Sequence, residues 1–119
     1  MINRINKIKE NAELVKKQLN IEYNEESIKF LEEFIERQKN RMDESKIDGL
    51  VNTLGSFLGE CIIENFGGSW QEDEYGLIVK FNKKNGVYPF SKIRKQFENG
   101  LEDAIFSFYT SIRLCCIKA

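Results

Sequence analysis

Histidine is absent from this chain of 119 residues, and proline occurs once. The lack of histidine excludes the commonest general base, the usual hydrolytic triads and histidine-ligated metal sites. Cysteine occurs only three times, as Cys61, Cys115 and Cys116, an odd number without the spacing of a metal site. We therefore expect free thiols, no disulfide framework, no metal and no cofactor.

Long apolar runs and a strong net charge are also missing. No segment approaches the ~20 apolar residues that span a bilayer. The first residues, MINRINKIKE, alternate apolar and charged positions and contain no signal-peptide core. The 18 basic and 19 acidic side chains leave a net charge of −1, unlike the large single-sign charge of nucleic-acid binders or their acidic mimics. The sequence therefore predicts a cytoplasmic protein that binds neither membranes nor nucleic acid.

The composition is that of one folded domain. Hydrophobic residues make up 41% of the chain and aromatic residues 12%, enough for a single core at this length. Two domains would leave both cores too small. We expect one domain over residues 1–119, with leading helices in 1–45 and a helix–meander–helix core in 46–119.

The leading segment predicts two amphipathic helices. Apolar residues recur at spacings of three and four over residues 3–20, which indicates one buried stripe. Asn24 is a suitable N-cap for the second helix, with two glutamates in its positive first turn. The residues expected on the two buried sides are Ile5, Ile8, Ala12, Val15, Leu19, Ile28, Leu31, Phe34, Ile35 and Met42.

A third helix is expected to be central. Ser45 and Asp48 fit a capping box at its start, and Gly67-Gly68 supplies a left-handed residue after Phe66. Gly55 and Gly59 lie one turn apart inside it, where each glycine costs about 1 kcal/mol relative to alanine. Close approach of another backbone would offset that cost.

The pattern then changes to short strands and turns. The segments SWQEDEYG, LIVKF and VYPF read as three antiparallel strands joined by turns at Gly76 and Asn85-Gly86. Pro89 donates no ladder hydrogen bond, so the third strand is an edge or ends there. Ser91 and Asp103 are expected to cap two final helices. The predicted fold is α+β, with N-terminal helices, a three-stranded antiparallel meander and two C-terminal helices on one face.

Three groups on the central helix are candidates for chemistry. Glu60 and Glu64 are four residues apart and share a face, so they are able to hold a cation or divide acid and base roles. Further metal ligands are not evident, and an exposed acidic patch is the favoured interpretation. Cys61 falls on the apolar stripe, where it reads as a small buried hydrophobe.

Charge segregates along the second half of the chain. Asp48, Glu60, Glu64, Glu72, Asp73 and Glu74 precede Lys80, and the following charged residues up to Lys95 are all basic. Two interpretations are open. The acidic segment is a partner-binding surface, or it pairs internally with the adjacent basic strand. Trp70 and Tyr75 are candidate aromatic anchors for a partner, although Trp70 also suits the core.

The order of glycine and apolar residues in the second half resembles a known family. The residues are Leu54-Gly55, Leu58-Gly59-Glu60, Ile62-Ile63, Gly67-Gly68, Trp70, Gly76, Pro89-Phe90, Lys92-Ile93, Asn99-Gly100, Ile105 and Phe108-Tyr109. They are similar to the small bacterial proteins grouped as domain-of-unknown-function family 3806. The resemblance covers residues 47–112 and implies a bacterial origin and this architecture, but no established activity or catalytic residue.

These features favour a non-enzymatic protein-binding domain, most concretely an immunity-type protein that neutralises a bacterial toxin by direct binding. The expected contacts are Glu60, Glu64, Trp70, Glu72, Asp73, Glu74 and Tyr75. One alternative is a small-ligand sensor or enzyme with a cleft near Glu60, using Tyr75 or Cys61. Another is an oligomerisation protein that associates through residues 1–42.

Overall fold

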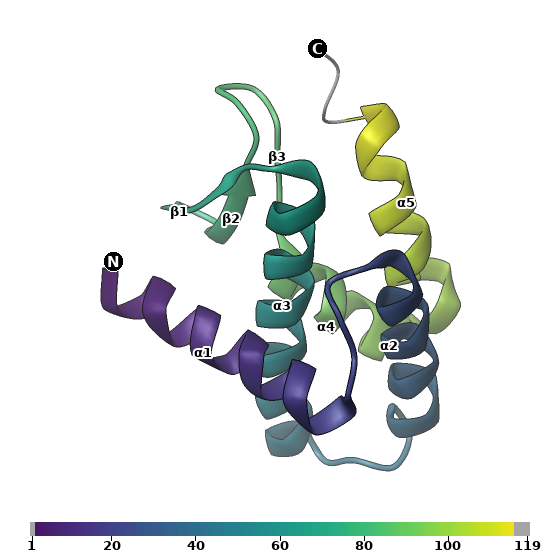
Figure 1. Ribbon diagram of the computed structural model, residues 1–119. Coiled ribbons are helices and arrows are strands. Elements are labelled where there is room, and N and C mark those ends of the chain that lie inside the picture. The colour runs from purple at the N-terminus through teal and green to yellow at the C-terminus, as the bar shows by residue number, and fades with distance from the viewer. Residues whose placement is uncertain (1, 116–119) are drawn as a thin grey trace.

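The structure, a computed structural model, describes residues 2–115 and contains five α-helices, a short 3-10 helix and one three-stranded sheet in that range (Figure 1). This is the α+β order that the sequence predicts. The elements are α1 (Ile2–Leu19), α2 (Glu25–Gln38), α3 (Glu44–Phe66), β1 (Ser69–Asp73), β2 (Gly76–Lys80), β3 (Gly86–Val87), α4 (Pro89–Asn99), η1 (Gly100–Asp103) and α5 (Ile105–Cys115).

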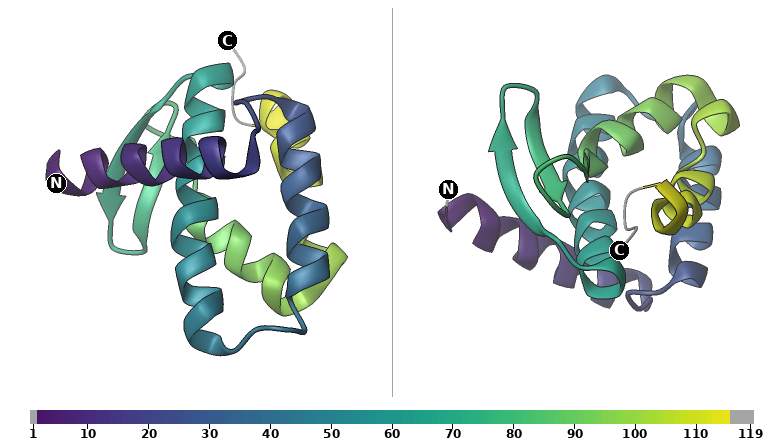
Figure 2. Two further views of the ribbon diagram at one scale, coloured as in Figure 1. Left: turned by 60° about the horizontal axis from the view of Figure 1, so that its bottom comes forward. Right: turned by 90° about the horizontal axis from the view of Figure 1, so that it is seen from above.

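Helix α3 is the central element, as predicted. Helices α1 and α4 both pack against it, and α1 crosses it at a steep angle (Figure 2). Helix α2 does not pack mainly on its neighbour in sequence but on α5, at the other end of the chain. The apolar stripe of α1 is buried at Ile8, Ala12 and Val15, which confirms the first predicted helix.

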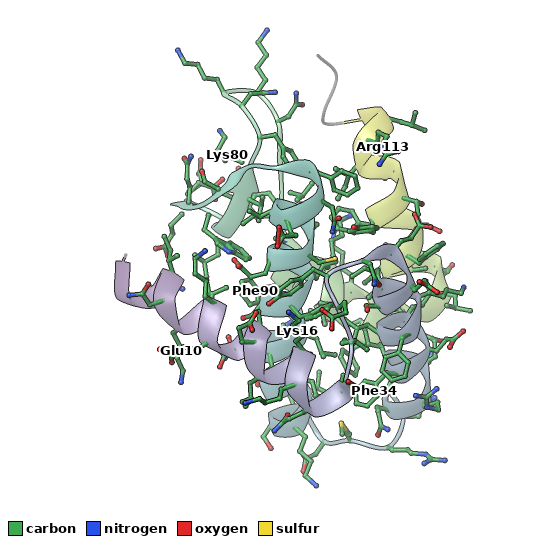
Figure 3. All side chains as sticks on the ribbon, viewed as in Figure 1. Glu10, Lys16, Phe34, Lys80, Phe90 and Arg113 are labelled. Atoms are coloured by element: carbon green, nitrogen blue, oxygen red, sulfur yellow. The ribbon has the colours of Figure 1, made fainter. Side chains whose placement is uncertain are left out.

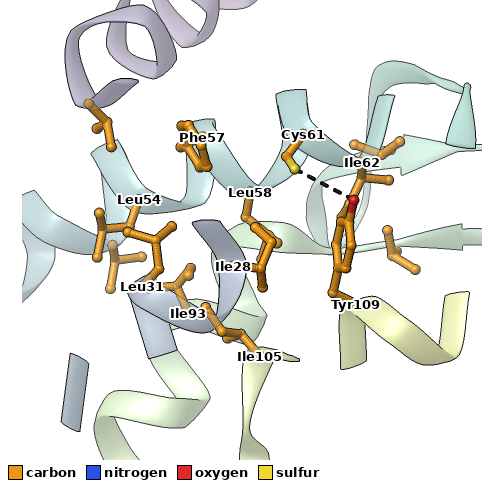
Figure 4. Packing of buried hydrophobic residues seen from close by; sticks show 14 of the residues in the cluster. Ile28, Leu31, Leu54, Phe57, Leu58, Cys61, Ile62, Ile93, Ile105 and Tyr109 are labelled. Atoms are coloured by element: carbon orange, nitrogen blue, oxygen red, sulfur yellow. Dashed lines mark hydrogen bonds between the residues drawn. The ribbon is translucent and has the colours of Figure 1, made fainter. Parts of the chain in front are cut away.

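One hydrophobic core joins the helices and the sheet, and it draws on both the leading segment and the second half of the chain. Figure 4 shows the centre of this core, where side chains of α2, α3, α4 and α5 meet. The fully buried side chains with the largest volumes include Phe57, Ile28, Leu31, Ile35, Leu54, Leu58, Ile62, Ile93, Ile105 and Ile112. Met42 lies beyond the end of α2 and is only half-buried.

The starts of α2 and α3 follow local capping rules, although one predicted cap is wrong. The Asn24 side chain accepts a hydrogen bond from the backbone N–H of Ser27 at 2.9 Å, which confirms the expected N-cap of α2. For α3 the cap is Asp43, which accepts from the N–H of Lys46, and not the Ser45–Asp48 box. Asp48 instead forms an ion pair with Arg94 of α4 at 2.6 Å.

The glycines of α3 make room for aromatic rings, and not for a second backbone as expected. A Cβ atom at Gly59 would overlap the indole of Trp70, and one at Gly55 would overlap the ring of Phe90. These two rings lie 5.6 Å apart between α3 and the sheet, and Figure 3 shows Phe90 beside α3. Strand β1 therefore packs on α3 through Trp70 at Gly59, and helix α4 packs on it through Phe90 at Gly55.

The sheet is the predicted antiparallel meander, in the order β1-β2-β3. Residue pairs run from Ser69 opposite Lys80 to Asp73 opposite Gly76, so a two-residue loop, Glu74-Tyr75, joins the first two strands. Gly76 has a φ of +122°, a backbone conformation that side chains disfavour. Strand β3 is an edge strand, as expected, but it ends at Val87, and Pro89-Phe90 of the predicted VYPF strand belong to α4.

The last two helices begin differently from the prediction. Pro89 is the first residue of α4, and Ser91 lies inside the helix and does not cap it. At α5, the N–H of Ile105 donates to the side-chain oxygen of Gln96 at 2.9 Å, and the N–H of Phe106 donates to Glu32 at 3.3 Å. The start of α5 is therefore satisfied by side chains from α4 and α2, in place of the expected cap from Asp103.

Candidate functional site

Glu60 anchors the sheet to the central helix. Its carboxylate accepts a hydrogen bond from the indole N–H of Trp70 at 2.8 Å and lies 3.7 Å from the Lys9 ammonium of α1. Only 14% of the Glu60 side chain is exposed. Both carboxylate oxygens therefore have partners from other elements, and the contact orients Trp70 over Gly59.

Trp70 is a core residue and Glu64 is a surface residue. Trp70 is 6% exposed, as the core interpretation predicts for a strand that lies over the central helix. Glu64 is exposed one turn after Glu60, and within the described part of the chain it forms no ion pair. The two carboxylates on α3 therefore lie in different environments and do not form one continuous acidic patch.

Three of the remaining candidates, Asp73, Glu74 and Tyr75, lie at the end of the β1–β2 hairpin. We call the group formed by Asp73, Glu74, Tyr75 and Tyr88 the hairpin tip. The Asp73 carboxylate accepts a hydrogen bond from the Tyr88 hydroxyl at 2.6 Å and another from the backbone N–H of Tyr75 at 2.8 Å. Tyr75 is 78% exposed, and its ring meets that of Tyr88 edge-on, with 6.4 Å between centroids and 88° between planes.

These contacts change the acidity of two groups at the hairpin tip. The hydrogen bond from Tyr88 is the main cause that holds the pKa of Asp73 below its ordinary value, with smaller contributions from the backbone N–H groups of Tyr75 and Gly76 and from Lys80. The same bond raises the pKa of Tyr88 to about 12, because ionisation would place a phenolate beside a carboxylate. The pair therefore stays linked over the neutral pH range.

One residue of the acidic segment, Glu72, pairs internally, but not with the basic strand. Glu72 forms an ion pair with Arg4 of α1 at 2.6 Å, and no ion pair joins β1 to β2 or β3 in the described chain. The register explains this, because Glu72 lies opposite Leu77 and Lys80 lies opposite Ser69. The Lys80 ammonium donates to the backbone carbonyl of Lys83 instead.

Tyr88 and Arg4 are the two members of this region that the sequence did not single out. Tyr88 reaches Asp73 from beyond the end of β3, and Arg4 reaches Glu72 from the first turn of α1. Neither contact can be recognised from a local sequence pattern, because the partners of Tyr88 and Arg4 are 15 and 68 residues away. Only the assembled fold brings these side chains together.

Cys61 is buried among polar groups that do not activate it. Its sulfur lies 3.6 Å from the Tyr109 hydroxyl, which Figure 4 shows as a dashed line, and 3.7 Å from the carbonyl of Asn24. Burial raises the pKa of the Cys61 thiol to about 11, so the thiolate is scarce at neutral pH. The prediction of a small buried hydrophobe is confirmed. The expectations for Cys115 and Cys116 concern side chains outside the described part.

The hollows of the surface do not coincide with these candidates. One, of about 670 Å³, runs along α1 and the loop after it and is lined by Leu14, Lys16 and Glu22 among others. Two others, of about 320 and 340 Å³, lie beside η1 and at the Ser69 end of the sheet. None of the three is lined by Glu60, Cys61 or Tyr75.

Two further features concern ligands and membranes. Among residues 2–115, no group of three or more cysteine, aspartate or glutamate residues is placed to hold a metal ion. Over the same range, no helix has both the length and the apolar character needed to cross a membrane.

No family model, curated protein or solved structure matches this chain. The resemblance to domain-of-unknown-function family 3806 therefore stays a prediction.

Proposed function

We propose that this protein is a non-enzymatic binding domain that contacts a protein partner through the hairpin tip. The observation that carries the proposal is the presentation of Tyr75, which is 78% exposed at the end of a two-residue turn. Asp73 holds the backbone of this turn, and Tyr88 supports the ring from the side. A large aromatic side chain with a fixed backbone is typical of the residues that dominate protein interfaces.

The surroundings of Tyr75 add charge to this contact. Glu74 is exposed beside it, and the Asp73 carboxylate, whose pKa the hydrogen bond from Tyr88 lowers further, is ionised at neutral pH. A partner with an apolar pocket rimmed by basic side chains would complement both features. These residues belong to the acidic segment that the sequence indicated. The proposed contact is centred on the turn at Glu74-Tyr75, and it does not include Glu60.

The residues suited to catalysis have structural partners, which also favours a binding role. Glu60 is engaged by Trp70 and Lys9, and Cys61 is buried with a raised pKa. The alternative is an enzyme or small-ligand sensor with a cleft near Glu60. The apolar stripe of α1 packs on α3 within the same chain, so association through residues 1–42 would have to use other faces.

The immunity-type role, a bacterial cytoplasmic location and the absence of nucleic-acid partners stay predictions within this proposal. An immunity protein neutralises a toxin by covering its active surface, and a rigid aromatic turn is suited to such a contact. The cognate toxin would then be the partner of Tyr75.

The test is affinity capture of partner proteins from a cell lysate on immobilised wild type and on the Tyr75→Ser and Leu101→Ser variants. Circular dichroism checks that each variant is folded. Leu101 is 61% exposed on η1, so its replacement removes a comparable apolar side chain from another element. We expect wild type and Leu101→Ser to retain the same stoichiometric partner, and Tyr75→Ser to retain at least about tenfold less. Equal capture by both variants, or no stoichiometric partner, would refute the proposal.

A further inference from the structure

Strand β1 is an outer edge of the sheet, and its register shows which backbone groups face outward. Phe81, just after β2, donates its backbone N–H to Asn85 on the β3 side. Backbone groups alternate in direction along a strand, so Val79 also faces β3, whereas Ile78 and Lys80 face β1. Their partners on β1 are Gln71 and Ser69. The backbone N–H and C=O of Trp70 and Glu72 therefore point away from the sheet.

These outward groups have no partner inside the chain. Within residues 2–115, no hydrogen bond from another element reaches the backbone N–H or C=O of Trp70 or Glu72. Figure 1 shows β1 at the outer side of the sheet, away from α4 and α5. Four backbone groups on one edge are thus in position to pair with an added strand.

The side chains of β1 leave the edge accessible. Trp70 and Glu72 point toward the helices, where Trp70 packs over α3 and Glu72 meets Arg4. The other face of the strand carries Ser69, Gln71 and Asp73, which are all exposed. The edge has none of the lysines, prolines or bulges that commonly block strand addition.

The charge along this edge indicates which kind of strand would bind there. One end is acidic, at Glu72, Asp73 and Glu74, and β1 itself carries no basic residue. A second copy of β1 would therefore offer no basic side chain opposite these carboxylates. A foreign strand with lysine or arginine at that end would offset their mutual repulsion and form cross-strand charge pairs.

We infer that β1 accepts an extended segment of a partner protein as a fourth strand, with basic residues of that segment beside Asp73 and Glu74. This inference rests on the proposed function and specifies the mode of binding. Main-chain hydrogen bonds at Trp70 and Glu72 would hold the segment, and the acidic end would fix its direction. The exposed Tyr75 ring adjoins the same end and would contact the body of the partner.

The test begins with selection of random linear peptides on the immobilised full-length protein, followed by titration of the synthetic winners. Two variants separate the contribution of the backbone N–H at the edge from that of the Glu72 carboxylate. Glu72→Pro removes an outward N–H that takes no part in pairing with β2, and Glu72→Ala removes the same carboxylate but keeps the N–H. We expect selected peptides to be rich in lysine and arginine, and to bind Glu72→Pro at least about tenfold more weakly than Glu72→Ala.

Hydrogen exchange gives a readout that does not depend on the variants. In wild type, bound peptide should slow the exchange of the Trp70 and Glu72 amides, while Gln71 and Asp73 are already protected by β2. Equal peptide binding by the two variants, or selection of peptides without basic residues, would overturn the inference. Protection of these amides in the protein alone, with dimers in sedimentation, would assign the edge to a second copy and also overturn it.

The two proposals fail separately. If no peptide is selected, or if peptides bind without protecting the edge amides, strand addition is wrong. The role of the hairpin tip would still stand if Tyr75→Ser loses the captured partner. If Tyr75→Ser retains the partner and peptides still bind at the β1 edge, the proposal for the hairpin tip fails, whereas the inference of strand addition at β1 stands.

Discussion

Glu60 and Glu64 show how far two like residues on one helix can diverge. They are one turn apart, yet Glu60 is mostly buried between Trp70 and Lys9, and Glu64 is exposed. The difference arises because β1 returns over α3 and places the indole N–H within 2.8 Å of one carboxylate. A buried indole donor needs such an acceptor, so Glu60 acts as a structural partner of Trp70.

We therefore expect Glu60→Ala to lower the free energy of unfolding by about 1–3 kcal/mol, because the Trp70 N–H would be left without an acceptor. Glu60→Gln is the matched control, since its amide oxygen still accepts that bond, and its cost should be below about 1 kcal/mol. Urea denaturation followed by tryptophan fluorescence measures both. Equal losses for the two variants would contradict the role assigned to this hydrogen bond.

The Asp73–Tyr88 bond predicts a stability change at both ends of the pH scale. The pKa of Tyr88 is raised to about 12, so its contribution is complete below pH 10 and is lost as pH rises toward 12. The pKa of Asp73 is lowered, so its contribution is present above the ordinary value of 3.8 and is lost as pH falls through the folded value.

The variant Tyr88→Phe tests this pair directly. We expect it to raise the pKa of Asp73 toward its ordinary value, although the N–H of Tyr75 still lowers it. Carboxyl titration by nuclear magnetic resonance measures that change, and ultraviolet titration should show the loss of one tyrosine that ionises near pH 12. An unchanged Asp73 titration would mean that the two side chains are not bonded in solution.

At the scale of elements, helix α3 contains glycines that packing requires and one, Gly49, that packing does not require. Gly59 makes room for the Trp70 ring, whereas a Cβ atom at Gly49 would meet nothing within 4 Å. Both lie in the same helix, so both carry the same propensity cost relative to alanine. Packing alone distinguishes them.

Alanine at these two positions should therefore have opposite effects. Gly49→Ala should stabilise the protein by about 0.5–1 kcal/mol, because it removes backbone entropy from the unfolded chain without a clash. Gly59→Ala should destabilise it by about 1–3 kcal/mol, because the ring of Trp70 must shift. Thermal unfolding of both variants measures the signs, and a stabilising Gly59→Ala would show that the sheet does not rest on α3 as described.

The sequence predicted helix and strand positions well because hydrophobic periodicity and turn residues are local. Asn24, Gly76 and Pro89 each act within a few residues, and all three are found as expected. The cap at Ser91 was wrong because Pro89 already begins α4 two residues earlier. The cap at Asp103 was wrong because the start of α5 is satisfied by Gln96 and Glu32, which no local pattern identifies.

The candidate site was predicted only in part, for the same physical reason. The acidic run at Glu72–Glu74 and the aromatic Tyr75 could be read directly from the sequence. Whether each carboxylate is free or paired depends on Arg4, Lys9 and Tyr88, which arrive from other elements. Glu60 changes from a surface candidate to a packed partner once β1 lies over α3, whereas Trp70 takes the core position that its sequence context also indicated.

A variant of Gln96 tests whether the start of α5 is capped by a side chain from α4. Its fully buried side chain donates to the backbone carbonyl of Glu32 and to the Glu36 carboxylate, and accepts from the N–H of Ile105. We expect Gln96→Leu to cost about 1–3 kcal/mol for each buried group left unpaired, as measured by urea denaturation. Gln18→Leu on the exposed side of α1 should stay within about 0.5 kcal/mol.

At the scale of the whole molecule, the apolar faces of the helices are satisfied within one chain. The radius of gyration of the Cα atoms is 13.4 Å, close to the ~13.5 Å expected for a compact monomer of this length. Among the described side chains, the large exposed hydrophobic residues other than Tyr75 are Leu14, Phe30, Leu101 and Leu114, one each on α1, α2, η1 and α5. Scattered residues of this kind do not form a dimer interface.

We therefore expect the isolated protein to be a monomer in solution. Small-angle X-ray scattering should give a molecular mass near 13.9 kDa across a concentration series. A concentration-independent dimer would contradict this expectation and favour the oligomerisation alternative. Loss of that dimer on replacing Leu14, which is 49% exposed on α1, would then locate the interface on the leading helix.

The pairing of α2 with α5 also sets an order for biosynthesis. During translation α2 is made before α5, the helix that covers it and whose first turn its Glu32 caps. Until residues near Ile112 have left the ribosome, Ile28, Leu31 and Ile35 lack part of their cover. Until α5 has been made, the nascent chain therefore carries a helix with a partly uncovered apolar face, a segment suited to chaperone contact, and a ribosome stalled before α5 would hold an incompletely folded protein.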